Sequence, residues 1–167
     1  MSEDYKIDKI SIRLVKDSSL NIDYPLSSPE KIAEVIGNEI RDMDREVFCV
    51  IHLKGDCSVA SYTFASVGSI DRAIVSPREI FKGAILSNAA SIVVMHNHPS
   101  GNIEPSDQDI GVTQRLNEAC NLMGIPLNDH IIVGAGNFEY YSFAEHNVVV
   151  NDKTIKLSMA AESPKTR

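Results

Sequence analysis

The strongest constraint on the fold of this chain comes from two short apolar runs separated by turn residues and helical patterns. Residues 47–53 (Val-Phe-Cys-Val-Ile-His-Leu) and 91–95 (Ser-Ile-Val-Val-Met) are apolar at nearly every position. Strands covered on one face alternate polar and apolar residues, whereas continuous runs are typical of strands buried on both faces. We therefore expect central strands with helices packed on both sides of a sheet.

Three helices are predicted around these runs from their capping residues and apolar periodicity. The first is capped by Ser28 and ends near Asp44, with apolar residues recurring at helical spacing between them. The second opens at residues 76–79 (Ser-Pro-Arg-Glu), a sequence typical of a capping box with proline at the first helical position. Ser106 can cap the third helix, which Gly124 ends.

Further strands are predicted from shorter segments. Residues 58–65 follow a turn and are expected to pair back on the strand at 47–53. Residues 130–133 and 138–142 predict two more strands, and the weak alternation of residues 9–15 predicts an edge strand. Strands that alternate with helices in this way indicate an α/β fold, and we expect a three-layer α/β/α domain.

The length of the chain fits one domain with a sizeable core. We divide the 167 residues into an N-terminal strand or extension over residues 1–27, a domain over residues 28–150 and a C-terminal tail over residues 151–167. The tail is expected to be flexible because the composition becomes polar there.

Charge and composition narrow the range of partners. The net charge is −7 and the basic residues are scattered, so sequence-independent binding of nucleic acid is not expected, although a small basic patch would be compatible with the sequence. No apolar run could span a bilayer, and the polar, acidic start lacks the layout of a signal peptide. The three cysteines form no C-x-x-C pair. These features predict a cytoplasmic protein with reduced thiols and no membrane partner.

The residues that carry the most functional information directly follow the apolar run at 91–95. His96 and His98 form an H-x-H pair, and Asp109 follows after ten intervening residues. Residues i and i+2 of an extended chain point to the same side, so the two imidazoles can converge on one ion. Asp109 falls in the first turn of the predicted third helix, from which its carboxylate could face them. Three protein ligands leave a fourth tetrahedral position open, which is typical of a catalytic metal ion.

Each part of this group also has a simpler interpretation. An H-x-H pair alone is weak evidence for a metal, and helix capping accounts for Ser106 and Asp109. His130 could orient a ligand imidazole, but a structural role is its simpler interpretation. The chain lacks H-E-x-x-H, typical of zincin proteases, and lacks H-x-E with P-C-x-x-C, typical of nucleobase deaminases. The literal string His-Asn-His is not evidence for an HNH nuclease, whose residues are dispersed through the sequence.

Longer motifs surround these residues. They are Ser-Pro-Arg-Glu at 76–79, Asn-Ala-Ala at 88–90, His-Asn-His-Pro-Ser-Gly at 96–101, Pro-Ser-Asp-Gln-Asp at 105–109 and Asp-His-Ile-Ile-Val-Gly at 129–134. Together they resemble the JAMM (JAB/MPN) metalloproteases, and the RadC-like bacterial branch most closely. The resemblance covers roughly residues 32–143. It implies the JAB/MPN fold, which is cytidine-deaminase-like with a mixed central sheet, for the domain over residues 28–150.

The same resemblance assigns roles to individual residues. It implies that His96, His98 and Asp109 bind Zn²⁺. It also implies that Glu46 is the general base and that the Ser106 hydroxyl hydrogen-bonds the ligand sphere or the oxyanion of the reaction. The implied activity is zinc-dependent hydrolysis of a peptide or isopeptide bond in a protein or peptide substrate. Without the resemblance, Glu46 is interpreted as a solvated carboxylate at the start of a strand.

Two other functions remain open from the sequence. One is a metal-dependent nuclease or DNA-repair accessory, which the RadC association suggests and the negative charge opposes; the other is a non-catalytic scaffold. Many RadC-like proteins carry a helix-hairpin-helix module, and the residues before Ser28 leave no room for one, which weakens a DNA-repair role. The short segment from Asp109 to Gly134 leaves little space for the insertions that hold ubiquitin in related enzymes, so ubiquitin-specific cleavage is not expected.

Overall fold

A five-stranded sheet organises the part of the chain that the computed structural model describes, which comprises residues 6–67, 76–136, 138–150 and 153–154. The elements in chain order are α1 (Pro29–Val35), the 3₁₀ helix η1 (Gly37–Glu39), β1 (Val47–Leu53), β2 (Val59–Val67), α2 (Pro77–Leu86), β3 (Ser91–His98), α3 (Asp107–Met123), β4 (Leu127–Gly134), β5 (Tyr140–Ser142), β6 (Val149–Val150) and β7 (Lys153–Thr154).

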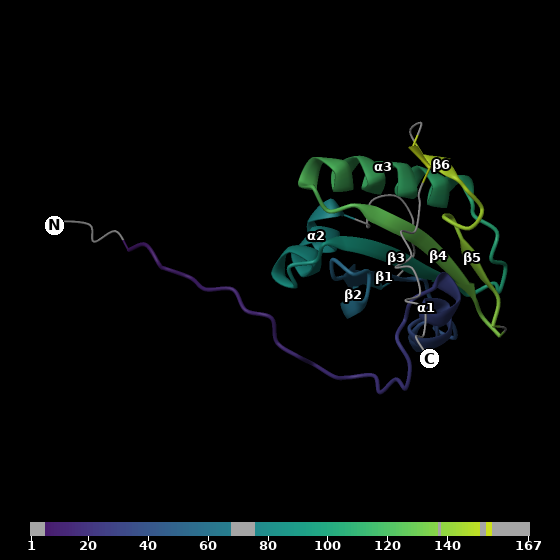
Figure 1. Ribbon diagram of the computed structural model, residues 1–167, viewed down its shortest axis with the longest axis horizontal. Helices are drawn as coiled ribbons and strands as arrows, with labels where there is room; N and C mark the ends of the chain where they lie inside the picture. The colour runs from purple at the N-terminus through teal and green to yellow at the C-terminus, as the bar shows by residue number, and fades with distance from the viewer. Residues whose placement is uncertain (1–5, 68–75, 137, 151–152, 155–167) are drawn as a thin grey trace, which may run out of the picture.

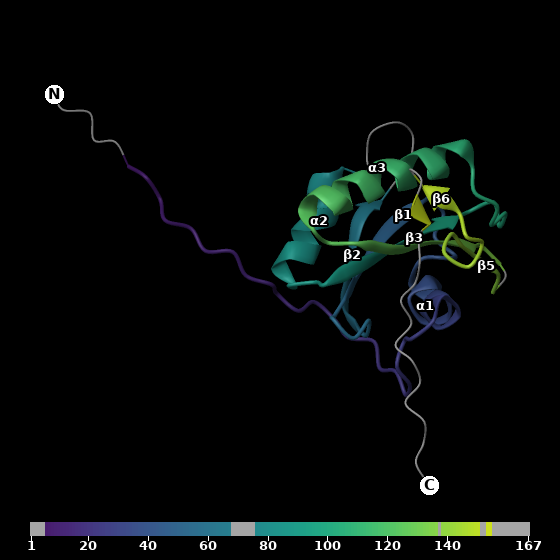
Figure 2. The ribbon, with the colours of Figure 1, turned by 45° about the horizontal axis from the view of Figure 1, so that its top comes forward.

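The sheet has the strand order β2-β1-β3-β4-β5 and is covered on both faces. Figures 1 and 2 show α1 on one side of the sheet and α3 on the other, and α2 packs into the same core as α3. Strands β3 and β4 are parallel, whereas all other neighbours in this sheet are antiparallel. The predicted α/β fold with helical layers on both sides of a mixed sheet is therefore confirmed.

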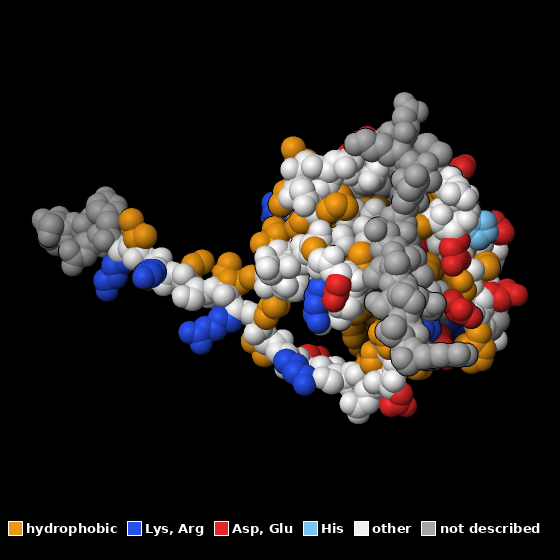
Figure 3. All heavy atoms as spheres, in the orientation of Figure 1, with side chains coloured by type: hydrophobic (Ala, Val, Ile, Leu, Met, Phe, Trp, Pro, Cys, Tyr) orange, Lys and Arg blue, Asp and Glu red, His pale blue; other side chains and the backbone are white. Residues whose placement is uncertain are grey.

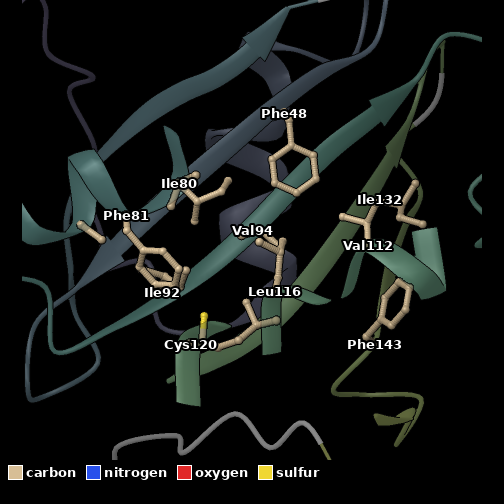
Figure 4. Packing of buried hydrophobic residues seen from close by; sticks show 13 residues of the cluster. Phe48, Ile80, Phe81, Ile92, Val94, Val112, Leu116, Cys120, Ile132 and Phe143 are labelled. Atoms are coloured by element: carbon tan, nitrogen blue, oxygen red, sulfur yellow. The ribbon is translucent and has the colours of Figure 1, made fainter. Parts of the chain in front are cut away.

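Two apolar cores fill the space between the sheet and the helices. On the α2–α3 side, Phe48 and Val94 from the central strands pack with Leu116 from α3 (Figure 4). On the opposite side, Ile51 from β1 packs with Ile32 from α1. Successive strand residues point to opposite faces, so β1 and β3 supply both cores. This explains why both strands are apolar at nearly every position.

The first helix is shorter than predicted. It ends at Val35 and is followed by the 3₁₀ turn η1, instead of continuing to Asp44. Gly37 marks the change: glycine is a poor helix former, and here the chain approaches the sheet closely. A Cβ atom on Gly37 would lie 3.0 Å from Cγ1 of Val133 in β4. A larger residue at this position would press against Val133.

The position at which α2 begins was predicted correctly, but the hydrogen bonds predicted to cap it are not present. Ser76 occupies the N-cap position and Pro77 the first turn, yet the Ser76 side chain makes no capping hydrogen bond. Glu79, the expected partner in a capping box, forms an ion pair with Lys82 instead. The predicted capping box is therefore wrong.

Residues 6–22 have no regular secondary structure, so the predicted edge strand over residues 9–15 is wrong. This segment extends away from the sheet, and both apolar and basic side chains are exposed along it (Figure 3). Ile7 and Val15, for example, are 98% and 87% exposed. None of the described strands pairs with the segment. It therefore lacks the inter-strand hydrogen bonds on which a strand depends.

The remaining expectations concern the later strands and the chain end. The strands predicted at 58–65, 130–133 and 138–142 are present as β2, β4 and a shorter β5. Of the predicted tail, Lys153 and Thr154 form β7, and the other residues lie outside the described part of the chain. Among the described residues, no helix combines the length and apolar character needed to cross a membrane.

Candidate metal site

The H-x-H pair lies at the carboxyl end of β3, beside the first turn of α3. Both histidines point to the α2–α3 face of the sheet, where the His96 ring stacks on Phe48 of the neighbouring strand at 6.0 Å between centroids. His96 is fully buried and His98 is partly buried. The predicted convergence of two imidazoles at a strand end is therefore present in the fold.

Asp109 completes a group of three ligand atoms. Its Oδ1 lies 3.1 Å from His96 Nε2, its Oδ2 lies 3.5 Å from His98 Nε2, and the two Nε2 atoms are 3.0 Å apart. All three candidate ligand atoms lie within 4.8 Å of one another. Imidazole nitrogen and carboxylate oxygen are both common metal donors. His96, His98 and Asp109 could therefore hold one metal ion.

Ser106 holds the Asp109 carboxylate in place. The Ser106 hydroxyl and backbone N–H both donate to Oδ2 of Asp109, at 2.6 and 2.8 Å, and the backbone N–H of Asp109 donates to the hydroxyl oxygen at 3.2 Å. These bonds form a capping box at the start of α3. The predicted cap is therefore confirmed. Because Oδ2 carries the capping bonds, Oδ1 is left to face His96.

The charge of the group is set by its internal hydrogen bonds. Burial alone would raise the pKa of Asp109, but hydrogen bonds with His96, His98 and Ser106 hold that pKa well below its ordinary value. The hydrogen bond with Asp109 raises the pKa of His98, against the opposing effect of burial. Asp109 is therefore an anion at neutral pH, which is the form that binds a cation.

The loop after β3 determines which nitrogen His98 presents. His98 Nδ1 lies 2.6 Å from the carbonyl oxygen of Asn102. A carbonyl oxygen can only accept, so Nδ1 carries the proton and donates it. In the neutral ring this leaves the lone pair on Nε2, the nitrogen that faces Asp109. His98 is thus oriented so that Nε2 is the nitrogen available to a metal.

Glu46 faces the same opening. β1 and β3 are antiparallel with Phe48 opposite His96, and continuing this register by two residues brings Glu46 opposite His98. Glu46 is partly buried and lines a cavity of about 240 Å³ together with His98, Ser106 and Asp109. The other residues that line this cavity are Ser100, Asn102, Glu104 and Gln108. Four of the five predicted site residues therefore share one cavity, and the fifth, His96, lies buried beside it.

Asn97, the residue between the two candidate ligand histidines, fixes the backbone around Glu46. It points to the opposite face, where its Oδ1 accepts from the backbone N–H of Val47 at 2.7 Å. Its Nδ2 donates to the carbonyl oxygens of Arg45 at 3.1 Å and Met43 at 3.4 Å. A buried amide inside an otherwise apolar strand was the available signal, because buried polar groups require partners.

A third buried histidine lies behind the site. His130 in β4 is fully buried, and its Nε2 is 2.8 Å from Nδ1 of His96. Burial lowers the pKa of His130 well below its ordinary value, so its ring is neutral. Two interpretations of His130 were open from the sequence, and this direct contact with a candidate ligand favours orientation of an imidazole over a purely structural role.

Comparison with known families supports this geometry. The sequence profile of the family described as the RadC-like JAB domain matches residues 26–148, which is most of the chain. The chain belongs to the RadC-like JAB family. The predicted resemblance is confirmed, and the match contains every element from α1 to β5 and every candidate site residue named above.

Several curated relatives in the RadC-like JAB family are described only as UPF0758 proteins. The relative from Salinibacter ruber is 44% identical over 125 residues, covering 74% of this chain and 52% of its own length. That from Pelobacter propionicus is 42% identical over 123 residues, covering 74% and 53%, respectively. That from Shouchella clausii is 44% identical over 113 residues, covering 68% and 49%. The chain thus spans about half the length of these relatives.

Proposed function

We propose that this protein is a zinc-dependent hydrolase that cleaves a peptide or isopeptide bond. One observation carries the proposal: His96, His98 and Asp109 converge on one point beside a cavity that Glu46 also lines. Three ligands with an acidic side chain next to them are the components that metal-assisted hydrolysis requires. An apolar or purely structural arrangement would not need both the ligands and the adjacent carboxylate.

Zinc fits the donor set well. Two imidazoles and one carboxylate suit its borderline character, and three protein ligands correspond to an open catalytic site. Zinc bound there would supply Lewis-acid chemistry, polarising a carbonyl group and lowering the pKa of water towards ~7. Asp109 is already ionised, and the Nδ1 proton of His98 is held by Asn102, so Nε2 is the nitrogen left for a metal.

Glu46 is the proposed general base. Its carboxylate lines the cavity across from His98, where it can accept a proton from the attacking water and deliver it to the leaving amine. Asn97 holds the backbone on both sides of Glu46 and so restricts its position. Ser106 keeps the Asp109 carboxylate oriented through its hydroxyl and lines the same cavity.

The experiment compares wild-type protein with the Glu46→Gln variant, which keeps the size of the side chain and removes its basicity. Both proteins are loaded with zinc, the metal content is measured, and hydrolysis of a mixed peptide and isopeptide library is followed by mass spectrometry. We expect equal zinc content and a loss of activity of about 10²–10⁴-fold in the variant, the usual contribution of a general base.

Two outcomes would contradict the proposal. Wild-type protein that takes up no stoichiometric zinc would remove its basis. Zinc-loaded wild-type protein that cleaves nothing in the library, with no difference from Glu46→Gln, would instead favour a scaffold role for the domain.

A further inference from the structure

We propose that His130 and Thr113 form a buried hydrogen-bond chain that fixes the tautomer of His96 and so presents its Nε2 lone pair to the metal. The inference rests on the proposed metal site and adds two positioning residues to it. Thr113 lies in the second turn of α3 and His130 in β4, and both side chains are fully buried.

Three short contacts make up the chain. Nδ1 of His96 lies 2.8 Å from Nε2 of His130, and Nδ1 of His130 lies 2.6 Å from Oγ1 of Thr113. Oγ1 of Thr113 in turn lies 2.6 Å from the backbone carbonyl oxygen of Asp109. The chain therefore begins at one candidate ligand and ends on the backbone of another, linking the end of β3 to the first turn of α3.

The chemistry of the end group assigns every proton in the chain. The Asp109 carbonyl oxygen can only accept, so the single hydroxyl proton of Thr113 is donated to it. The hydroxyl oxygen is left as an acceptor, so Nδ1 of His130 carries a proton and donates to it. In a neutral ring this makes Nε2 of His130 the acceptor for the Nδ1–H of His96.

The surroundings of His130 keep its ring neutral, as the assignment requires. The ring stacks on Phe143 at 4.8 Å between centroids and lies 5.7 Å from the Phe48 ring. Among the described residues, no carboxylate is hydrogen-bonded to the ring nitrogens of His130, which pair with His96 and Thr113. Charging a buried ring without such a partner is costly.

The consequence for His96 follows directly. With its Nδ1 proton held by His130, His96 can offer only Nε2 to a metal, and this atom faces Asp109 at 3.1 Å. His98 reaches the same state through the Asn102 carbonyl. The Nδ1 proton of His98 is thus held by an exposed loop, and that of His96 is held by a buried chain of hydrogen bonds. Hydrogen bonds of this kind to ligand imidazoles typically contribute 10- to 100-fold in metal affinity.

Three variants test the hydrogen-bond chain through zinc affinity, measured by competition with a chromophoric chelator. Thr113→Val keeps the shape and removes the hydroxyl, and we expect affinity about 10-fold weaker. His130→Asn removes the acceptor for His96, and we expect a loss on the order of 100-fold. His130→Gln can place a carbonyl oxygen near the position of Nε2, so we expect it to recover part of that loss.

The matched control is His52→Asn. His52 is also fully buried on the same face of the sheet, but it lies at the opposite end of β1 and hydrogen-bonds Ser61 rather than a site residue. We expect this variant to lose thermal stability without any change in zinc affinity. If His52→Asn weakens zinc binding as much as His130→Asn, the effect is general destabilisation and the inference is overturned.

Nuclear magnetic resonance tests the tautomer without metal. In metal-free protein with ¹⁵N-labelled histidine, long-range proton–nitrogen correlations distinguish a protonated ring nitrogen from one with a lone pair. We expect His130 to be a single Nδ1–H tautomer; an Nε2–H tautomer would overturn the inference even if zinc binds. Conversely, failure of wild-type protein to bind zinc would contradict the proposed function, while the Nδ1–H tautomer would still support the hydrogen-bond chain.

Discussion

Two fully buried histidines, His52 and His130, lie on the same face of the sheet but are connected differently. The His52 ring makes one hydrogen bond, to Ser61, and its Nε2 has no partner among the described residues. It packs against α2, where a Cβ atom on Gly83 would lie 2.9 Å from its ring. His130 uses both ring nitrogens, and its partners lead to His96 and, through Thr113, to Asp109.

The difference shows that burial and residue type do not distinguish a site histidine from a structural one. Both rings are inaccessible to solvent, and burial lowers the pKa of both. Only the direction of their hydrogen bonds separates them. The hydrogen bond of the His52 ring leads only to Ser61, away from the candidate site. The hydrogen bonds of the His130 ring lead to His96 and, through Thr113, to Asp109. Substitutions at the candidate metal ligands should therefore change zinc binding, whereas substitutions elsewhere in the core should change only stability.

The largest effect is expected from Asp109→Asn, which keeps the shape of the side chain and removes its charge. Because Asp109 is a direct ligand in the proposed site, zinc affinity should fall by more than the roughly 100-fold upper range for groups that only orient ligands. The measurement is zinc competition with a chelator, and His52→Asn should bind like wild type. Equal zinc affinity of Asp109→Asn and wild type would show that Asp109 does not bind the metal and would contradict the contrast with His52.

An intermediate effect is expected from the pH dependence of stability at His52. Burial lowers the pKa of His52 to about 4 from an ordinary value of 6.5. Below pH 6.5 the unfolded chain gains a proton at this position that the folded chain excludes. The stability contributed by the neutral ring is therefore complete above pH 6.5 and is lost as the pH falls towards 4, by on the order of 3 kcal/mol.

Urea unfolding of wild type and His52→Asn at several pH values between 7.5 and 4.5 measures this contribution. We expect the wild type to lose more stability than the variant as the pH falls, because other acid-sensitive groups are common to both proteins. Parallel curves for the two proteins would show that His52 does not titrate in this range on unfolding.

The smallest effect is expected from two helix caps that form another matched pair. The Ser28 and Ser106 side chains each accept a backbone N–H, at the starts of α1 and α3. Replacing either with alanine should cost about 1 kcal/mol of stability, the usual value for such a cap. Only Ser106 also donates to Asp109, so only Ser106→Ala should weaken zinc binding as well. Identical zinc affinities in the two variants would limit Ser106 to capping.

The fold could be predicted largely from local patterns. Continuous apolar runs in the sequence predict strands that are buried on both faces. The predicted caps of α3, Ser106 and Gly124, are the caps in the structure. The errors occurred where tertiary contacts decide. Gly37 ends α1 near the sheet, and residues 9–15 depend on a partner strand that local alternation does not provide.

The candidate site shows the same division. His96, His98 and Asp109 fall within one short motif, so their spacing alone suggested a metal. The sequence allowed His130 to orient a ligand imidazole but did not predict its partners, because they are distant: 34 residues separate His96 from His130, and 17 separate His130 from Thr113. Asn97 likewise bonds a backbone group 50 residues away. Only the folded chain brings these groups together.

Zinc K-edge X-ray absorption on the loaded protein shows whether His96, His98 and Asp109 bind one zinc ion. We expect one zinc per chain with four nitrogen or oxygen ligands at about 2.0–2.1 Å, and scattering features that require two imidazoles. In His98→Ala, the signal should fit one imidazole. A sulfur ligand at about 2.3 Å, or a wild-type spectrum without imidazole scattering, would place the zinc elsewhere and contradict the proposed site.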